Sequence, residues 1–163
     1  MIDLLRLDER LIHGQVATGW VKQLRCDTLL VVDDSSANDK FLTNTLYMAA
    51  PAGIKTFVMT NEQALNVLND PRCDNRHVFV VVKTMDTLLN LVTNARNVKE
   101  IQISNYGRMV PSNKTRKNYG GHLFLDEDEV AILKKVQASG LPCSMQMTPT
   151  SPKTDLSKIL KDE

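Results

Sequence analysis

The sequence predicts an α/β domain of three layers, α/β/α, built on an open, mostly parallel sheet with helices on both faces. Short apolar runs recur along the chain, and segments with apolar residues at helical spacing lie between most of them. Strand, helix and strand in this order require right-handed crossovers, and strands that are apolar on both sides must be covered twice. Because 163 residues suit one hydrophobic core, we expect a single domain over residues 1–163.

The predicted strands are runs rich in Val, Ile and Leu, which favour extended backbone inside a sheet. In chain order they are residues 2–7, 28–32, 54–59, 78–82, 101–103 and 142–147. Each run is short and apolar, so we expect all six strands to be buried.

The predicted helices each carry one apolar stripe. They cover residues 16–24, 42–49, 88–95 and 130–136. Pro and Gly in residues 50–53 and 139–142 mark the joints from a helix to the next strand. Asp126 and Glu129 have the spacing of a capping box at the start of the last helix.

The composition of the chain excludes several classes of function. Lys and Arg number 20 and Asp and Glu number 19, a net charge of 20 − 19 = +1, so nucleic acid or an anionic membrane surface is not an expected general partner. No run approaches the roughly 18 apolar residues of a membrane span, and we expect a cytoplasmic protein. The three cysteines, Cys26, Cys73 and Cys143, lack a metal-binding spacing, so we expect free thiols and no metal.

Residues 105–121 form a basic segment that contains Arg108, Lys114, Arg116 and Lys117 and no acidic residue. Its Gly and Pro content predicts a loop or a loose hairpin. Two interpretations stay open from composition: a solvated connection, or a surface that docks an acidic partner.

Three side chains that can take part in catalysis or anion binding follow the first predicted strand. They are Asp8, Arg10 and His13, and they precede a predicted helix. Unpaired N–H groups at a helix N-terminus favour a bound anion such as phosphate, and Gly14 allows close backbone approach. A neutral imidazole can attack phosphorus, a carboxylate can orient it, and an arginine can grip phosphoryl oxygens. Spacing alone also fits a helix cap or a surface ion pair, which are the commoner arrangements.

The full string is more specific than the spacing. Residues 6–16 read Arg-Leu-Asp-Glu-Arg-Leu-Ile-His-Gly-Gln-Val. This string resembles the active-site signature of the enzyme IIB components of the mannose/fructose/sorbose family of the bacterial phosphoenolpyruvate-dependent sugar phosphotransferase system. The resemblance covers nearly the whole chain, including Trp20 and the closing Pro149-x-x-Pro152-Lys153-x-Asp155-Leu156.

The resemblance implies a protein-phosphohistidine-sugar phosphotransferase component without metal or organic cofactor. His13 would accept a phosphoryl group from enzyme IIA and pass it to a sugar that moves through the membrane components IIC and IID. By the same alignment Asp8 lies near the imidazole, Arg10 binds phosphate, and Gly14 and Gln15 supply backbone N–H groups. The resemblance places the chain in the cytoplasm at the membrane transporter and leaves the sugar and a homo-oligomeric state open.

One stretch departs from the family pattern. Many members have Asn-Val-Gly-Gly-Met where this chain has Asn-Tyr-Gly-Arg-Met at residues 105–109, with bulkier residues and an extra charge. Together with the basic segment, this departure yields the hypothesis that Arg108, Lys114, Arg116 or Lys117 steers an acidic enzyme IIA.

Two rival functions use other residues. Asp33 and Asp34 follow the second strand, as the acids of a receiver domain do, but residues 82–84 lack the acid that a receiver carries on a later strand. We expect these acids and Thr84 to cap turns or helices. A nucleotide-binding regulatory domain is disfavoured because no candidate strand is followed by Gly-x-Gly-x-x-Gly or a Walker loop. His77 and His122 have no partner at metal-binding spacing.

Overall fold

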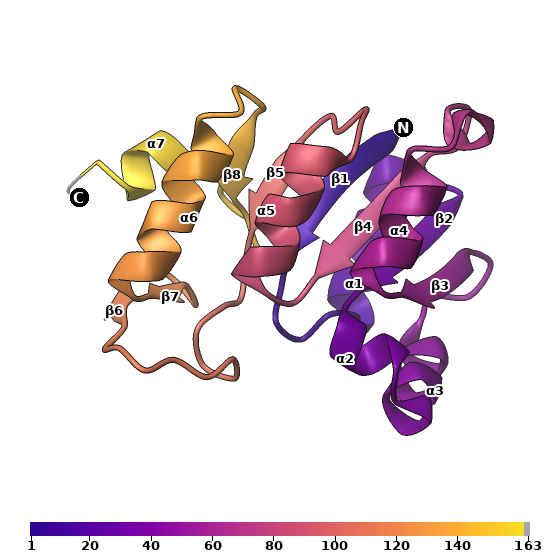
Figure 1. Cartoon of the computed structure of the whole chain (residues 1–163), viewed down its shortest axis with the longest axis horizontal. Coiled ribbons are helices and arrows are strands. Elements are labelled where there is room, and N and C mark those ends of the chain that lie inside the picture. Colours follow the sequence, from indigo (N-terminus) through magenta and orange to yellow (C-terminus); the bar gives the residue numbers. More distant parts are fainter. Residues whose placement is uncertain (162–163) are drawn as a thin grey trace.

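The computed structural model describes residues 1–161, two residues short of the predicted domain end at residue 163, and centres on a seven-stranded sheet (Figure 1). The order across the sheet is β3-β2-β4-β1-β5-β8-β9. Its strands are β1 (Ile2–Leu7), β2 (Thr28–Val32), β3 (Lys55–Met59), β4 (Val78–Val82), β5 (Ile101–Ile103), β8 (Cys143–Met145) and β9 (Thr154–Asp155). A separate antiparallel pair consists of β6 (Lys117–Asn118) and β7 (Phe124–Leu125).

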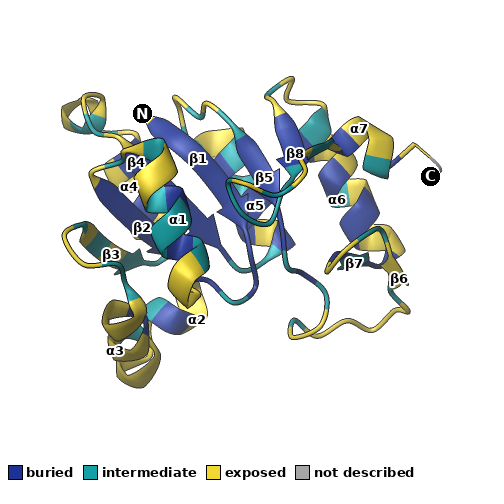
Figure 2. Ribbon diagram, turned by 180° about the vertical axis from the view of Figure 1, so that it is seen from behind, coloured by how far each residue is buried: buried dark blue, intermediate teal, exposed yellow. Residues whose placement is uncertain are grey.

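Helices lie on both faces of this sheet. They are α1 (Gly14–Leu24), α2 (Asp34–Ala37), α3 (Lys40–Ala49), α4 (Asn61–Leu68), the 3₁₀ turn η1 (Pro71–Cys73), α5 (Met85–Asn94), α6 (Glu127–Gln137) and α7 (Leu156–Ile159). Figure 1 shows α4, α5 and α6 in front of the sheet, and Figure 2 shows α1 on the opposite face. Alternate strand residues serve the two layers: Leu5 packs in the core under α5 and α6, whereas Leu4 packs with Trp20 of α1. The predicted fold class is confirmed.

Strands β1 and β4 are neighbours in the sheet, and the connections that follow them run in opposite directions across it. From β1 the chain crosses through α1 to β2 on one side, and from β4 it crosses through α5 to β5 on the other. The loops after β1 and β4 therefore diverge at the carboxyl ends of adjacent parallel strands. In open α/β sheets, ligands bind at this kind of crevice.

Several elements differ from the sequence-based expectation. The predicted buried strand 54–59 is β3, a half-exposed edge strand, because it pairs with β2 only and its Phe57 is 40% exposed. The predicted strand 142–147 shortens to β8, after which the chain turns away and returns as the antiparallel β9. Helix α4 was not predicted, although Thr60 and Gln63 form its capping box.

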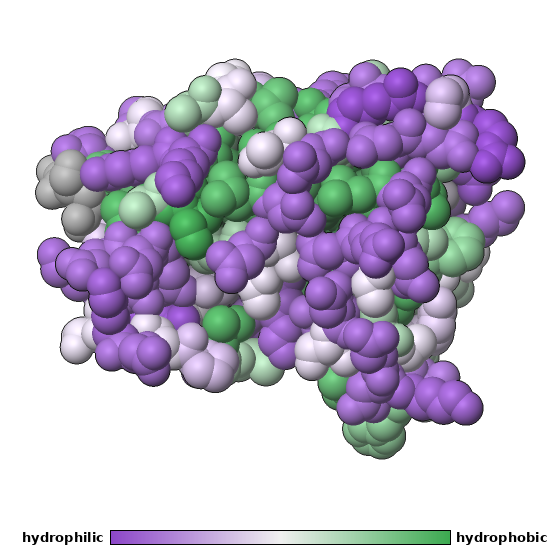
Figure 3. All heavy atoms as spheres, in the orientation of Figure 1, coloured by the Kyte–Doolittle hydropathy of each residue, from purple (hydrophilic) through white to green (hydrophobic). Residues whose placement is uncertain are grey.

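Helix α3 buries less of its apolar stripe than its sequence suggests. Of its residues only Leu46 is buried, while Phe41 is 76% and Met48 is 88% exposed. The face drawn in Figure 3 is mixed, with apolar patches lying among hydrophilic side chains. Within residues 1–161, no helix combines the length and apolar character needed to cross a membrane.

Candidate functional site

The turn after β1 is fixed by backbone hydrogen bonds and by one strained residue. The N–H of Asp8 donates to the carbonyl of Val82 at the end of β4 (3.0 Å), and the N–H of Leu11 donates back to the carbonyl of Asp8 (2.9 Å). Leu11 has φ = 59°, a left-handed conformation that costs on the order of 1 kcal/mol for a residue with a Cβ. This turn buries Ile12 and leaves His13 exposed.

Asp8 and Arg10 form a rigid pair within this turn. The Arg10 Nε donates to Asp8 Oδ1 at 3.1 Å and its Nη2 donates to Asp8 Oδ2 at 3.0 Å, a bidentate arrangement. The backbone N–H of Arg10 adds a third bond to Asp8 Oδ1 at 3.0 Å. The Asp8 side chain is 2% exposed and the Arg10 side chain 26%, so Asp8 anchors an Arg10 that still reaches solvent.

Asn105, at the end of β5, completes the surroundings of Arg10. Its carbonyl accepts the backbone N–H of Glu9 at 2.8 Å. In the amide orientation that satisfies both partners, its side-chain oxygen accepts from Arg10 Nη2 at 2.5 Å. Within residues 1–161, Arg10 Nη1 has no hydrogen-bond partner, so this nitrogen is available to an incoming oxyanion.

His13 is the N-cap residue of α1, and its side chain makes no cap hydrogen bond. His13, Gly14 and Gln15 are consecutive exposed residues, and the first turn of α1 contains no acidic side chain. Gly14 has φ = +44°, in the region that favours glycine, and a Cβ at this position would meet no other atom within 4 Å. Among residues 1–161 the N–H groups of Gly14 and Gln15 have no hydrogen-bond acceptor, so the helix N-terminus presents them beside an accessible imidazole.

The structure brings some of the predicted site residues together and leaves one predicted contact unmade. Asp8 and Arg10 pair with each other, a contact that the sequence reasoning did not predict. Both Asp8 oxygens face Arg10, however, and no hydrogen bond joins Asp8 to His13 among the described residues. In this state Asp8 acts on Arg10 rather than on the imidazole.

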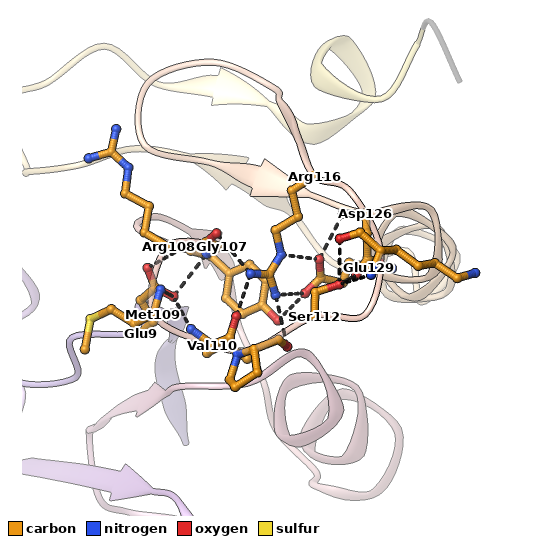
Figure 4. A network of polar contacts seen from close by, with 12 residues as sticks. Glu9, Gly107, Arg108, Met109, Val110, Ser112, Arg116, Asp126 and Glu129 are labelled. Atoms are coloured by element: carbon orange, nitrogen blue, oxygen red, sulfur yellow. Dashed lines mark hydrogen bonds and ion pairs between the residues drawn. The ribbon is translucent and has the colours of Figure 1, made fainter.

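Glu9 lies between Asp8 and Arg10 but points to another part of the molecule. Its carboxylate is buried and accepts four backbone N–H bonds of 3.0–3.2 Å from residues 107–110 (Figure 4). Burial alone raises the pKa of Glu9, but the four N–H donors outweigh it, so the pKa lies below its ordinary value. Glu9 is therefore ionised at neutral pH.

Arg6 of β1 is a buried cation two residues before Asp8. Its guanidinium donates to the side chains of Gln102 and Ser104 on one side and to the carbonyls of residues 146 and 147 on the other, at 2.7–2.8 Å. The same group lies 5.2 Å from the ring centroid of Trp20, whose indole N–H also donates to the carbonyl of Met147 at 3.2 Å. Burial lowers the pKa of Arg6 to about 10, which still leaves it charged at neutral pH.

The basic segment 105–121 is more ordered than a solvated loop. Arg116 is 12% exposed and pairs with Glu129 at 2.9 Å, and Lys114 pairs with Glu127 and Asp128 of α6. Lys117 lies in β6 of the β6–β7 hairpin. Arg116 is internal and Lys114 is already paired with two carboxylates, so both charges are compensated within the chain. Arg108 is exposed and has no carboxylate partner within residues 1–161.

The rival sites have structural roles. Asp33 caps α2 through the N–H and hydroxyl of Ser36, and Thr84 caps α5 through the N–H of Thr87. The Nδ1 atom of His77 lies 3.1 Å from Oδ2 of Asp3. Within residues 1–161, no group of three His, Cys, Asp or Glu side chains is arranged to hold a metal ion.

The cysteines are free thiols, as expected, and two of them are shielded. Burial raises the pKa of Cys26 to about 11 and that of Cys143 to about 12, so both remain protonated near neutral pH. These thiols are small core residues, and nothing places them near His13.

Sequence reasoning missed Glu9 and Arg6 as residues that shape the site. The bonds of Glu9 reach residues 107–110, and those of Arg6 reach positions up to 147, so no local spacing reveals either set. The basic character of residues 105–121 is no signal for Glu9 either, because Glu9 accepts backbone N–H groups and not basic side chains.

Comparison with known families matches residues 2–163 to the family described as "PTS system sorbose subfamily IIB component". This match confirms the resemblance drawn from residues 6–16. The matched region takes in the whole turn that carries Asp8, Arg10 and His13.

Individual relatives agree with the family match. The chain is 31% identical over 162 residues to a probable phosphotransferase enzyme IIB component of Streptococcus pyogenes, covering 98% of this chain and 99% of that protein. It is 28% identical to the mannose-specific EIIAB component of the phosphotransferase system of Escherichia coli, covering 98% of this chain and 48% of that protein. The crystal structure of manxB from Thermoanaerobacter tengcongensis superposes with a TM-score of 0.87 at 30% identity, covering 99% of this chain and 95% of that chain.

Proposed function

We propose a phosphoryl-carrier role for His13, on the premise that this chain belongs to the sorbose subfamily of IIB components of the sugar phosphotransferase system. The chain is thus a phosphotransferase component of sugar uptake, and the proposal concerns which residues carry the phosphoryl group. One observation supports it above the others: His13 is exposed at the N-terminus of α1 with no cap hydrogen bond. Its imidazole has no structural task, and it stands where an anion is favoured.

The chemistry consists of two displacements at phosphorus. A lone pair of the His13 imidazole forms a new N–P bond while the N–P bond of a donor phosphohistidine breaks. In the second step the N–P bond of His13 breaks as a sugar hydroxyl oxygen bonds to phosphorus and releases its proton. Both steps need positioning and charge stabilisation.

Arg10 and the start of α1 supply that stabilisation in this proposal. Asp8 holds the Arg10 guanidinium through Nε and Nη2, which leaves Nη1 for a phosphoryl oxygen. The N–H groups of Gly14 and Gln15 face the same anion at the helix N-terminus. Asp8 is then a positioning residue that acts through Arg10.

The partners follow from the same proposal. Enzyme IIA donates the phosphoryl group, the membrane components IIC and IID receive the loaded chain, and the sugar is the final acceptor. The relative from Escherichia coli is named an EIIAB component, and this chain covers 48% of it, which supports a physical association with a IIA domain. The chain would act in the cytoplasm, at the surface of the transporter.

The test is to rebuild the relay from phosphoenolpyruvate through enzyme I, HPr and enzyme IIA to this chain. We expect one phosphoryl group by intact mass, labile in acid and stable in alkali, on the peptide that contains His13. Several enzyme IIA proteins serve as donors, since donors of this family differ. Phosphoryl label on a different peptide, or label that is stable in acid, would contradict the proposal.

Replacing Arg10 with lysine is expected to slow phosphoryl transfer about 100-fold, because an ammonium cannot bind Asp8 in bidentate fashion and also reach a phosphoryl oxygen. Quenched-flow measurement of a single transfer from phosphorylated enzyme IIA gives the rate. Arg72, whose side chain is 89% exposed, provides the matched Arg72→Lys control. A rate for Arg10→Lys within about threefold of wild type would exclude this role for Arg10.

A further inference from the structure

Residues 107–110 form a loop whose backbone converges on one carboxylate. Glu9 Oε1 accepts the N–H groups of residues 107, 109 and 110, and Oε2 accepts the N–H of Arg108. Figure 4 shows the Glu9 side chain among these donors. Four charge-assisted bonds to one buried anion fix the loop relative to the turn that carries Asp8 and Arg10.

The same loop is held from its other side by Arg116. The Arg116 Nη1 donates to the carbonyl of Gly107 at 3.0 Å and to that of Val110 at 2.5 Å, while its Nε and Nη2 bind Glu129 of α6. Gly107 has φ = +102°, and a Cβ there would lie 2.0 Å from the carbonyl oxygen of Phe124. The loop is therefore clamped between Glu9, Arg116 and β7 and has little freedom to move.

This clamped loop presents one exposed cation. The backbone N–H of Arg108 is fixed by Glu9 at 3.1 Å, and its guanidinium lies 4.8 Å from the ring centroid of Phe124. No carboxylate within residues 1–161 pairs with Arg108, in contrast to Lys114 and Arg116. Met109 beside it is 59% exposed, so an apolar side chain adjoins the charge.

We propose that Glu9 is a positioning residue that fixes the 107–110 loop so that Arg108 meets an acidic surface on the protein that exchanges the phosphoryl group with His13. The inference rests on the proposed function. An arginine whose backbone and guanidinium are both held in place loses little conformational entropy on binding. An exposed cation at the rim of a protein contact mainly raises the association rate, and its effect falls with salt.

Glu9 links this contact to the phosphoryl site through the chain itself. Its own N–H is held by Asn105, whose side chain faces Arg10, and its neighbours in sequence are Asp8 and Arg10. One short segment therefore fixes both the phosphate-binding guanidinium and the loop with Arg108. We expect docking and phosphate binding to occur on one edge of the molecule, at the carboxyl ends of β1 and β5.

The experiment compares Glu9→Gln, Arg108→Ala and the double variant in phosphoryl transfer from phosphorylated enzyme IIA. Gln replaces one carboxylate oxygen with an NH2 group, which cannot accept an N–H, and it removes the charge. Each single variant is expected to raise KM for the donor about fivefold at low ionic strength with kcat unchanged, and the double variant is expected to add little more. Glu62→Gln, on the surface of α4, is the matched control.

The possible results distinguish a failure of the inference from a failure of the proposed function. KM values that multiply in the double variant mean that Glu9 acts independently of Arg108, which overturns the inference. An Arg108→Ala variant with wild-type KM at all salt concentrations overturns it as well, and this variant leaves the Glu9 clamp intact should Glu9→Gln not fold. Mapping the label in wild type in the same assay tests the proposed function separately, since that proposal fails if His13 is not labelled.

Discussion

Replacing His13 with alanine is expected to abolish phosphorylation of the chain, a loss of at least about 1,000-fold in transfer rate. In the proposed relay the imidazole forms the bond to phosphorus, and no neighbouring residue can substitute for it. The fold should be unaffected, because the His13 side chain makes no cap hydrogen bond and is exposed. Intact mass after incubation with the complete relay measures the first effect, and a thermal melt measures the second.

His122 provides the matched control for this variant. It is also an exposed histidine, and it lies between the strands of the β6–β7 hairpin rather than in the turn after β1. His122→Ala should accept the phosphoryl group at the wild-type rate. A phosphoryl group retained by His13→Ala would refute the assignment of the carrier residue.

The central strands could be predicted from sequence because their burial leaves a local signature. Strands β1, β2, β4 and β5 have the predicted bounds, and each consists of residues that are buried without interruption. Strand β3 has a similar apolar composition, but its edge position depends on the order of strands in the sheet, which no local pattern reports. Helix α4 was missed because only Ala64 and Leu68 of its eight residues are buried.

The contacts of the site also divide into local ones, which the sequence can indicate, and long-range ones, which it cannot. The sequence identified Asp8 and Arg10, two residues apart, as site residues, but it assigned Asp8 to the imidazole and not to Arg10. The bonds of Glu9 and Arg6 join β1 and the turn after it to positions about a hundred residues later. Such contacts exist only because β5 lies beside β1 in the sheet.

Replacing Arg6 with methionine is expected to lower the free energy of unfolding by about 3 kcal/mol. Methionine fills similar volume, so the loss reports mainly the hydrogen bonds. Four acceptors would lose a charged donor in a buried site, and only the Met147 carbonyl keeps another, the indole N–H of Trp20. Each unsatisfied buried acceptor costs about 1–3 kcal/mol, which is partly offset because a buried charge is removed. Chemical denaturation at neutral pH measures the change.

The melting temperature should fall by about 6–12 °C for a domain of this size. Arg72→Met is the control, because that arginine is 89% exposed and its pairing with Asp70 lies at the surface, so its melt should match wild type. If Arg6→Met stays within about 1 kcal/mol of wild type, the acceptors are satisfied without the guanidinium and the account of the buried cation fails. If the predicted loss is found, Arg6 stabilises the elements that carry the site. Its hydrogen bonds join β1 and β5 to residues 146 and 147, and the indole of Trp20 in α1 binds the same segment. The helix that begins at His13 is then held in place by a buried charge that takes no part in the transfer.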